Sequence, residues 1–323
     1  MFRVDYRYVG GTGLQVSALG LGTMTWGRDT DEMDAADQLA EFTEAGGTLL
    51  DTASSYGDGA AEALIGTLLR SGLAARDEVV ICTKGGSRLS DGHYRTDASR
   101  GNLLANLNES LKRLGTDYVD LWLVQRPDPA VTLEETLAAL QDAQRAGKAR
   151  YVGLSNYPAW TLARAHTLLQ AHAPLGGGIA AAQSEYSLLN RSAETELVPC
   201  ATALGIGLLA WSPLGRGVLT GKYRHAVPAD SRAASSHLSG FVAPYLNSAA
   251  AGVVEAVATA AHGLGAAPLD VALAWVRQRT GVASAILGAR TPAQLHTALA
   301  GAHLQLPGAI VEALDEVSGL PRR

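Results

Sequence analysis

The chain has 323 residues, of which 47% are hydrophobic and 18% are charged, so it is long enough to bury a large core. Its net charge of −5 and its lack of basic runs exclude a bulk attraction to nucleic acid or acidic membranes, and we expect neither as a partner. The N-terminal segment lacks the apolar stretch of a signal peptide, and Cys82 and Cys200 stand alone. We therefore expect a cytoplasmic protein.

The predicted elements begin with a hairpin and continue as a repeating strand–helix pattern. Two short alternating segments surround Gly10, Gly11 and Gly13, which predicts an N-terminal β-hairpin. An apolar run at residues 16–23 leads into a helical pattern, whose predicted inner face carries Met33, Ala36, Leu39 and Phe42. Seven more apolar runs are each followed by a helical segment, and they lie at residues 48–53, 79–84, 120–124, 149–155, 180–186, 207–212 and 283–289.

This alternation predicts a single (β/α)8 barrel, also called a TIM barrel, as one domain over residues 1–323. Continuous apolar strands are typical of parallel strands with both faces covered, and helices are the usual crossovers between them. A doubly wound sheet with two lobes is the competing layout. However, no linker divides the chain, and the segment GLGTMTWG lacks the glycine spacing of a dinucleotide-binding turn. The long polar stretches 85–99 and 216–247 follow strands, so we expect them as binding loops on the carboxyl face.

Polar side chains stand at the carboxyl ends of three successive predicted strands. Asp51 ends the second strand with Tyr56 just beyond it, Lys84 ends the third, and Gln125 ends the fourth. Neighbouring strands of a barrel should bring these four side chains together on one rim. A lysine beside a tyrosine stabilises the phenolate, which predicts a proton donor with a lowered pKa, and a carboxylate keeps that lysine charged. Singly, each residue could instead be a helix cap, a turn aromatic or a solvated strand end.

The motifs around these residues resemble those of the aldo-keto reductases. The segments GGTLLDTASSYGDGAAEALIG, VVICTK, YVDLWLVQRPDP, ARYVGLSN, AAQSEYSLLNR, LLAWSPLGRGVLTGKY and ILGARTPAQL are similar to that family in the same order and cover essentially the whole chain. The resemblance is closest to the bacterial long-chain branch that includes the potassium-channel β-subunits. It implies a (β/α)8 barrel that binds NADP(H) without a Rossmann fold. It also implies hydride transfer between nicotinamide C4 and a carbonyl substrate.

The resemblance assigns roles to the strand-end residues. Asp51, Tyr56 and Lys84 match three members of the family's catalytic tetrad, with Tyr56 as the proton donor. Gln125 stands where the family usually has a histidine. A glutamine amide can donate an N–H to a carbonyl oxygen, but it cannot titrate between about pH 5 and pH 8. The catalytic set is therefore Asp51, Tyr56, Lys84 and Gln125, with one departure from the family.

The resemblance also implies a set of cofactor contacts. Side chains at the ends of strands five and six match those that bind the nicotinamide carboxamide, and Trp211 matches the ring that stacks on the nicotinamide. The following loop matches the one that embraces the pyrophosphate. Arg290, beside the helix start at Thr291-Pro292, suits the 2′-phosphate, whereas Thr297 and Ala298 stand where the family often has Glu-Asn against adenine. The full expected set is Thr23, Met24, Asp51, Ser155, Asn156, Gln183, Trp211, Ser212, Pro213, Leu214, Arg216, Gly217, Lys222, Arg232, Gly288, Arg290 and Gln294.

Three functional hypotheses are open at this point. The first is an NADPH-dependent reductase of a small-molecule carbonyl, and the second is a cofactor-bound regulatory subunit with slow turnover, which Gln125 favours. The third is another barrel chemistry, such as a metal hydrolase or a phosphate isomerase; we expect no metal site, because no histidine ends a strand. Aromatic side chains predict an aromatic, glycosidic or polyketide-like substrate, and the expected substrate contacts are Trp26, Tyr56, His93 and Tyr94, with further apolar area from Trp122.

Overall fold

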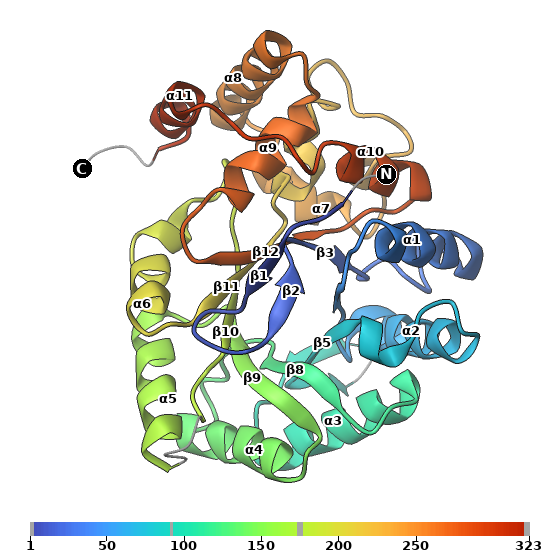
Figure 1. The fold of residues 1–323 in the computed structure, drawn as a ribbon, viewed down its shortest axis with the longest axis vertical. Helices are drawn as coiled ribbons and strands as arrows, with labels where there is room; N and C mark the ends of the chain where they lie inside the picture. The colour runs from blue at the N-terminus through green and yellow to red at the C-terminus, as the bar shows by residue number, and fades with distance from the viewer. Residues whose placement is uncertain (1–2, 91–92, 173–176, 320–323) are drawn as a thin grey trace.

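The computed structural model describes residues 3–90, 93–172 and 177–319, and its centre is a closed barrel of parallel strands. The strands follow one another around the barrel in chain order, and the last pairs with the first. Helices surround the barrel on its outside (Figure 1). The predicted (β/α)8 barrel is therefore confirmed, and the doubly wound layout is excluded. The barrel strands are β3 Leu19–Gly22, β4 Leu49–Asp51, β5 Val80–Gly85, β8 Val119–Val124, β9 Ala149–Ser155, β10 Ala181–Glu185, β11 Gly207–Trp211 and β12 Val282–Leu287.

The helices form the outer layer, and short 3-10 helices lie in several connections. The α-helices are α1 Glu32–Glu44, α2 Ala60–Arg70, α3 Arg100–Leu114, α4 Leu133–Arg145, α5 Ala159–His172, α6 Leu197–Ala203, α7 Ser239–Val242, α8 Ser248–Leu264, α9 Pro268–Arg277, α10 Pro292–Ala300 and α11 Gly308–Ser318. The 3-10 helices are η1 Tyr56–Gly59, η2 Arg76–Glu78, η3 Ser192–Glu194, η4 Gly215–Thr220, η5 Arg232–Ala234 and η6 Ala243–Tyr245.

The inner face of α1 differs from the predicted one. Leu39 and Phe42 are fully buried as expected, but Met33 is 72% exposed, and Ala35 and Gln38 are buried in its place. The cause is the spacing of the predicted positions. A strict interval of three residues drifts by about 60° per step on a helix with 3.6 residues per turn, so Met33 lies about 180° from Phe42.

The predicted N-terminal hairpin is confirmed, and it closes one end of the barrel. Strands β1 (Tyr6–Tyr8) and β2 (Gln15–Ser17) are antiparallel, and the hairpin lies near the centre of the view in Figure 1. Val9, Leu14 and Val16 pack into one buried cluster with barrel residues such as Leu49. Gly10 has a φ of 57°, and a Cβ there would lie 2.1 Å from the carbonyl oxygen of Gly205. Glycine is therefore required at this turn.

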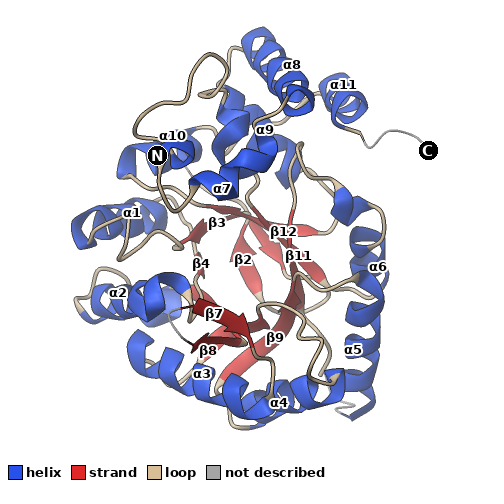
Figure 2. Cartoon of the chain, turned by 180° about the vertical axis from the view of Figure 1, so that it is seen from behind, coloured by secondary structure: helices blue, strands red, loops and turns tan. Residues whose placement is uncertain are grey.

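Two excursions cover the opposite end of the barrel. Residues 85–99, predicted as an irregular loop, contain a second antiparallel hairpin, β6 (Ser87–Ser90) with β7 (His93–Thr96). Figure 2 shows β7 in front of the barrel at the carboxyl ends of the strands. The longer excursion, residues 216–247, includes most of η4 and all of η5, α7 and η6. Both excursions follow strands, as predicted, so both lie where the polar strand ends converge.

Among the described helices, none is by itself both long and apolar enough to cross a membrane. One bent pair, Ser239–Tyr245 with Ser248–Leu264, meets those criteria only when its two parts are taken together across a 78° bend.

Candidate active site

A buried ion pair lies where β4 and β5 end. Lys84 Nζ lies 2.8 Å and 2.9 Å from the two carboxylate oxygens of Asp51, and it also donates to the carbonyl oxygen of Thr52 at 2.6 Å. Gln183 Nε2 donates to Asp51 Oδ1 at 2.7 Å, so the carboxylate has a second donor. Both charged side chains are almost completely buried. Burial lowers the pKa of Lys84, but Asp51, with smaller contributions from Tyr56 and Cys82, raises it by more in total, so the pKa is raised and the ammonium stays charged.

Tyr56 lies beside this pair in η1, immediately after β4. Lys84 Nζ is 5.0 Å from the centroid of the phenol ring. The pKa of Tyr56 is raised, mainly because burial disfavours the phenolate, although the Lys84 charge opposes this shift. The expectation of a lowered pKa was therefore wrong, because it counted the lysine and left out the burial. The phenol keeps its proton at neutral pH.

Gln125 follows β8 and completes the group at this end of the cavity. Its amide oxygen accepts hydrogen bonds from Ser87 Oγ at 2.9 Å and from Ser55 Oγ at 3.1 Å. Its backbone N–H donates to the carbonyl oxygen of Gly85 at 2.9 Å, and its own carbonyl oxygen accepts from Asn156 Nδ2 at 3.1 Å. Sequence reasoning missed both serines, because a serine in a polar loop carries no distinctive pattern.

A hydrogen-bonded row of polar side chains continues along the strand ends. Asn156 Nδ2 also donates to Ser155 Oγ at 3.0 Å, and Trp211 Nε1 donates to Asn156 Oδ1 at 3.1 Å. Asn156 has a φ of 61°, a left-handed conformation that asparagine tolerates better than most residues. Trp211 lies 6.5 Å from Phe241 between ring centroids, with the two rings inclined by only 20°. Phe241 was not predicted, because it is one apolar side chain within a long polar stretch.

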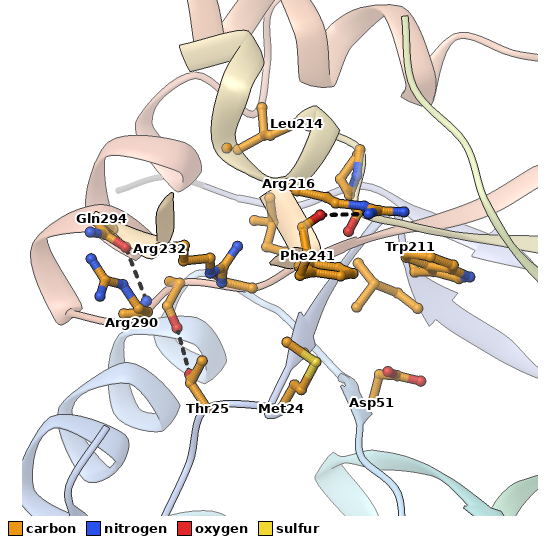
Figure 3. A pocket seen from close by; sticks show the side chains of 18 of the residues that line it. Met24, Thr25, Asp51, Trp211, Leu214, Arg216, Arg232, Phe241, Arg290 and Gln294 are labelled. Atoms are coloured by element: carbon orange, nitrogen blue, oxygen red, sulfur yellow. Dashed lines mark hydrogen bonds between the residues drawn. The ribbon is translucent and has the colours of Figure 1, made fainter. Parts of the chain in front are cut away.

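One cavity of about 560 Å³ joins these residues. Asp51 and Trp211 lie toward one end of it, and Arg232, Arg290 and Gln294 lie toward the other (Figure 3). All the predicted cofactor-binding residues line this cavity except Thr23. Thr23 is fully buried, and its hydroxyl donates to the carbonyl oxygen of Asp51 at 3.1 Å. It therefore holds the main chain of Asp51 and does not contact the cavity.

Three cations gather at the far end of the cavity. Lys222, Arg232 and Arg290 all line it, and within the described part of the chain none of them forms an ion pair with a carboxylate. Arg232 donates to the carbonyl oxygen of Gly288, and Arg290 donates to that of Asp230. Burial and the two arginines lower the pKa of Lys222, and burial together with Arg290 lowers that of Arg232. An anion here would relieve a repulsion that the ligand-free protein contains.

The start of α10 adds to this cationic end. Thr291 caps the helix by accepting a hydrogen bond from the backbone N–H of Gln294 at 3.3 Å, and Pro292 is the first helical residue, as the sequence predicts. The Gln294 side chain accepts from the backbone N–H of Arg290 at 3.0 Å and fixes that residue against the helix. A helix N-terminus carries partial positive charge, so it suits the same anion as the three cations.

Arg216, another predicted cofactor contact, is paired with a carboxylate. Its guanidinium binds both carboxylate oxygens of Glu185, at 2.8 Å and 2.7 Å, and also donates to the carbonyl oxygen of Phe241. It stacks on the rings of Phe241 and Tyr245, at 4.2 Å and 4.9 Å from their centroids. Arg216 lines the cavity as predicted, and its charge is paired with Glu185, which fastens the second excursion to the barrel.

The structure corrects the expectation that Trp26 and Trp122 offer their rings to a substrate. Trp26 and Trp122 are fully buried, and Trp26 Nε1 donates to Gln38 Oε1 at 3.1 Å, so neither ring offers a surface to a ligand. Tyr94 is 43% exposed, and its hydroxyl donates to Asp58 Oδ1 at 2.8 Å. His93 is exposed on the other face of β7, because successive residues of a strand alternate. Of the four predicted contacts, Tyr56 alone lines the cavity that the described residues enclose.

Within residues 3–90, 93–172 and 177–319, no group of three or more histidine, cysteine, aspartate or glutamate side chains is placed to hold a metal ion.

The sequence model of the aldo/keto reductase family matches residues 18–318. The chain is 38% identical to "Protein tas" of Escherichia coli K12, over 97% of each chain. It is 36% identical to an L-glyceraldehyde 3-phosphate reductase of the same organism, over 91% of this chain and 86% of the relative. It is 34% identical to a putative voltage-gated potassium channel subunit beta of Schizosaccharomyces pombe, over 90% of this chain and 86% of the relative.

Proposed function

Because the chain belongs to the aldo/keto reductase family and is an oxidoreductase of that family, we propose that it uses NADPH to reduce a carbonyl group to an alcohol. The observation that supports this proposal most directly is the layout of one cavity. A tyrosine with a buried lysine–carboxylate pair lies at one end, and at the other lie three cations that have no carboxylate partner among the described residues. The substrate in this proposal is a small aldehyde or ketone.

The lining of the cavity and its charges suit a phosphorylated nicotinamide cofactor. Lys222, Arg232 and Arg290, with the start of α10, suit the phosphate groups. Asn156, Gln183 and Trp211 suit the nicotinamide, which supplies a hydride from C4 when it is bound. Thr297 and Ala298 also line the cavity, and these small side chains would contact adenine without a carboxylate or an amide. The phosphates therefore carry most of the recognition in this proposal.

The protein itself contributes two things to reduction: the proton of Tyr56 and the positive charge of Lys84, which stabilises the tyrosinate left when that proton is donated. Tyr56 holds its proton at neutral pH and donates it from Oη to the carbonyl oxygen of the substrate. The Lys84 ammonium stabilises the tyrosinate that remains, and solvent returns the proton afterwards. Asp51 keeps Lys84 charged and oriented, and Gln183 holds Asp51. Gln125 donates an amide N–H to the same carbonyl oxygen, which polarises it.

The direct test is NADPH oxidation with a broad panel of aldehydes and ketones, combined with fluorescence titration of NADPH and NADH. We expect turnover on part of the panel and tighter binding of NADPH. Tyr56→Phe is the control, because it removes the proton donor and leaves the cationic end unchanged. A wild-type protein that binds neither cofactor would refute the proposal.

A second candidate function rests on Gln125. An amide at this position cannot exchange protons as a histidine does, and one relative is named a putative potassium channel subunit beta. The candidate is a cofactor-bound subunit with slow turnover. The same experiment separates the two functions, because this one predicts tight NADPH binding without oxidation by any carbonyl on the panel.

A further inference from the structure

We propose that Ser55 and Ser87 are positioning residues that fix the side-chain amide of Gln125, so that its nitrogen faces the carbonyl oxygen of the substrate. This inference rests on the proposed carbonyl reduction and adds two residues to it. Neither serine matches a residue of the tetrad. Both contact a tetrad position from outside the barrel strands.

The two serine hydroxyls occupy one side of the amide. Ser55 precedes η1, and Ser87 begins β6, so they approach Gln125 from two different segments. Each donates its single O–H to Gln125 Oε1, at 3.1 Å and 2.9 Å, and an amide oxygen has two lone pairs to accept them. Among the described residues, Nε2 of Gln125 has no hydrogen-bond partner, and Gln125 lines the cavity together with Tyr56 and Lys84. The amide N–H is therefore the group left for a ligand.

The backbone of Gln125 is held independently of the serines. Its N–H and its carbonyl oxygen bind Gly85 and Asn156, so the main chain can keep its place when the serines are removed. The amide itself could then rotate by half a turn and bring Oε1 into the cavity. Two oxygen acceptors would then face each other, because a carbonyl oxygen has no proton to donate. The two serine O–H groups favour the observed orientation, in which Oε1 accepts a hydrogen bond from each of them.

The fixed amide also defines what the site recognises. Tyr56 Oη and Gln125 Nε2 both present hydrogen-bond donors, which match the two lone pairs of one carbonyl oxygen. The Tyr56 phenol keeps its proton because its pKa is raised, and the amide has no proton to lose near neutrality. The pair of donors is therefore independent of pH over the neutral range, in contrast to a tyrosine–histidine pair.

The kinetic test combines Ser55→Ala and Ser87→Ala with Gln125→Ala, using 4-nitrobenzaldehyde and NADPH. We expect each serine change to lower kcat/KM by about 3- to 10-fold, the usual range for one neutral hydrogen bond. The double change should lower it by roughly 10- to 100-fold and leave the Kd for NADPH unchanged. In the Gln125→Ala background the same changes should have no further effect, because the group that they hold is gone.

Two controls separate positioning from a general structural effect. Ser55→Thr and Ser87→Thr keep the hydroxyl and should recover most of the activity. Ser318→Ala removes a half-buried hydroxyl of α11 that also donates a hydrogen bond, and it should behave like wild type. The inference would be overturned if the serine changes lowered kcat/KM equally in the wild-type and Gln125→Ala backgrounds. It would also be overturned if the double serine variant had wild-type kinetics.

A wild-type protein that reduces none of the carbonyl compounds would count against the proposed function but not against the positioning role of the two serines. A second measurement tests that role without turnover. Protein labelled selectively with ¹³C and ¹⁵N glutamine gives the Gln125 signals, identified by their loss in Gln125→Ala. In Ser55→Ala and Ser87→Ala the signal of the amide carbonyl carbon should move, because its oxygen loses a hydrogen bond, while the amide protons change little. Movement of the amide protons with an unchanged carbonyl carbon would show the opposite orientation and overturn the inference.

Discussion

Replacing Arg290 with alanine should separate the two nicotinamide cofactors. The side chain lines the cationic end of the cavity, where Lys222 and Arg232 carry two further positive charges. NADPH differs from NADH by one phosphate group. Loss of Arg290 should therefore weaken NADPH binding and leave NADH binding nearly unchanged.

The magnitude follows from the kind of contact that is lost. A hydrogen bond to a charged group contributes about 1.5–3 kcal/mol, which corresponds to a roughly 10- to 150-fold increase in Kd. Two cations remain, so binding should not be abolished. The ligand-free protein should lose little stability, within about 0.5 kcal/mol, because Arg290 has no carboxylate partner in the part of the chain that the structure describes and is repelled by its neighbours.

Tryptophan fluorescence titration with both cofactors measures the two Kd values, and thermal unfolding measures the stability. Arg224→Ala is the matched control, because it removes the same charge from a site outside the cavity, where Arg224 of the excursion 216–247 is paired with Glu255. Equal weakening of NADPH and NADH by Arg290→Ala would refute the reasoning. So would an equal effect of Arg224→Ala on NADPH binding.

Three further predictions concern the other end of the cavity. Tyr56→Phe should lower kcat/KM for reduction by about 10²- to 10⁴-fold and leave the Kd for NADPH within a factor of a few, measured by steady-state kinetics and titration. Lys84→Met should lower the free energy of unfolding measured in urea by about 3–5 kcal/mol, because it leaves the Asp51 carboxylate buried without a cation, and adding Asp51→Asn should recover part of this loss. Since the pKa of Lys84 is raised, the contribution of the pair is fully present below about pH 10 and is lost only as the pH rises through that raised value. The pH profile of the wild-type reduction rate should show no titration step from Gln125 or Tyr56 between about pH 6 and pH 9. The profile of Gln125→His should show one at about pH 6.5.

The sequence was informative about the fold because parallel strands and crossover helices leave a periodic record. Several barrel strands are apolar runs with a polar residue at the carboxyl end, so the sequence places Asp51, Lys84 and Gln125 on one rim. The same argument placed both long excursions at that rim. The hairpin inside residues 85–99 was missed, because its strands are exposed and lack an apolar alternation.

The errors at the site share one physical cause. Burial and pairing depend on contacts between segments far apart in the chain, which local patterns do not record. Trp26 was expected to face a ligand, but Gln38 of α1 satisfies its indole N–H in the interior. Arg216 was expected among the cofactor contacts, and the sequence did not indicate that Glu185 of β10 pairs with it. The pKa of Tyr56 was expected to be lowered by one neighbour, whereas the whole environment raises it.

The two ends of the cavity differ in how their charges are balanced, and this difference separates binding from chemistry. Asp51 and Lys84 neutralise each other inside the protein, whereas Lys222, Arg232 and Arg290 depend on a ligand for neutralisation. Contacts with a remote phosphate are the same in the ground state and in the transition state, so they should change affinity and leave the chemical step alone. We therefore expect NADH at saturation to support nearly the same rate of hydride transfer as NADPH, in single-turnover measurements with a deuterated cofactor to isolate that step. A hydride-transfer rate at saturating NADH that is lower by as large a factor as the affinity would show that the cationic end also orients the nicotinamide.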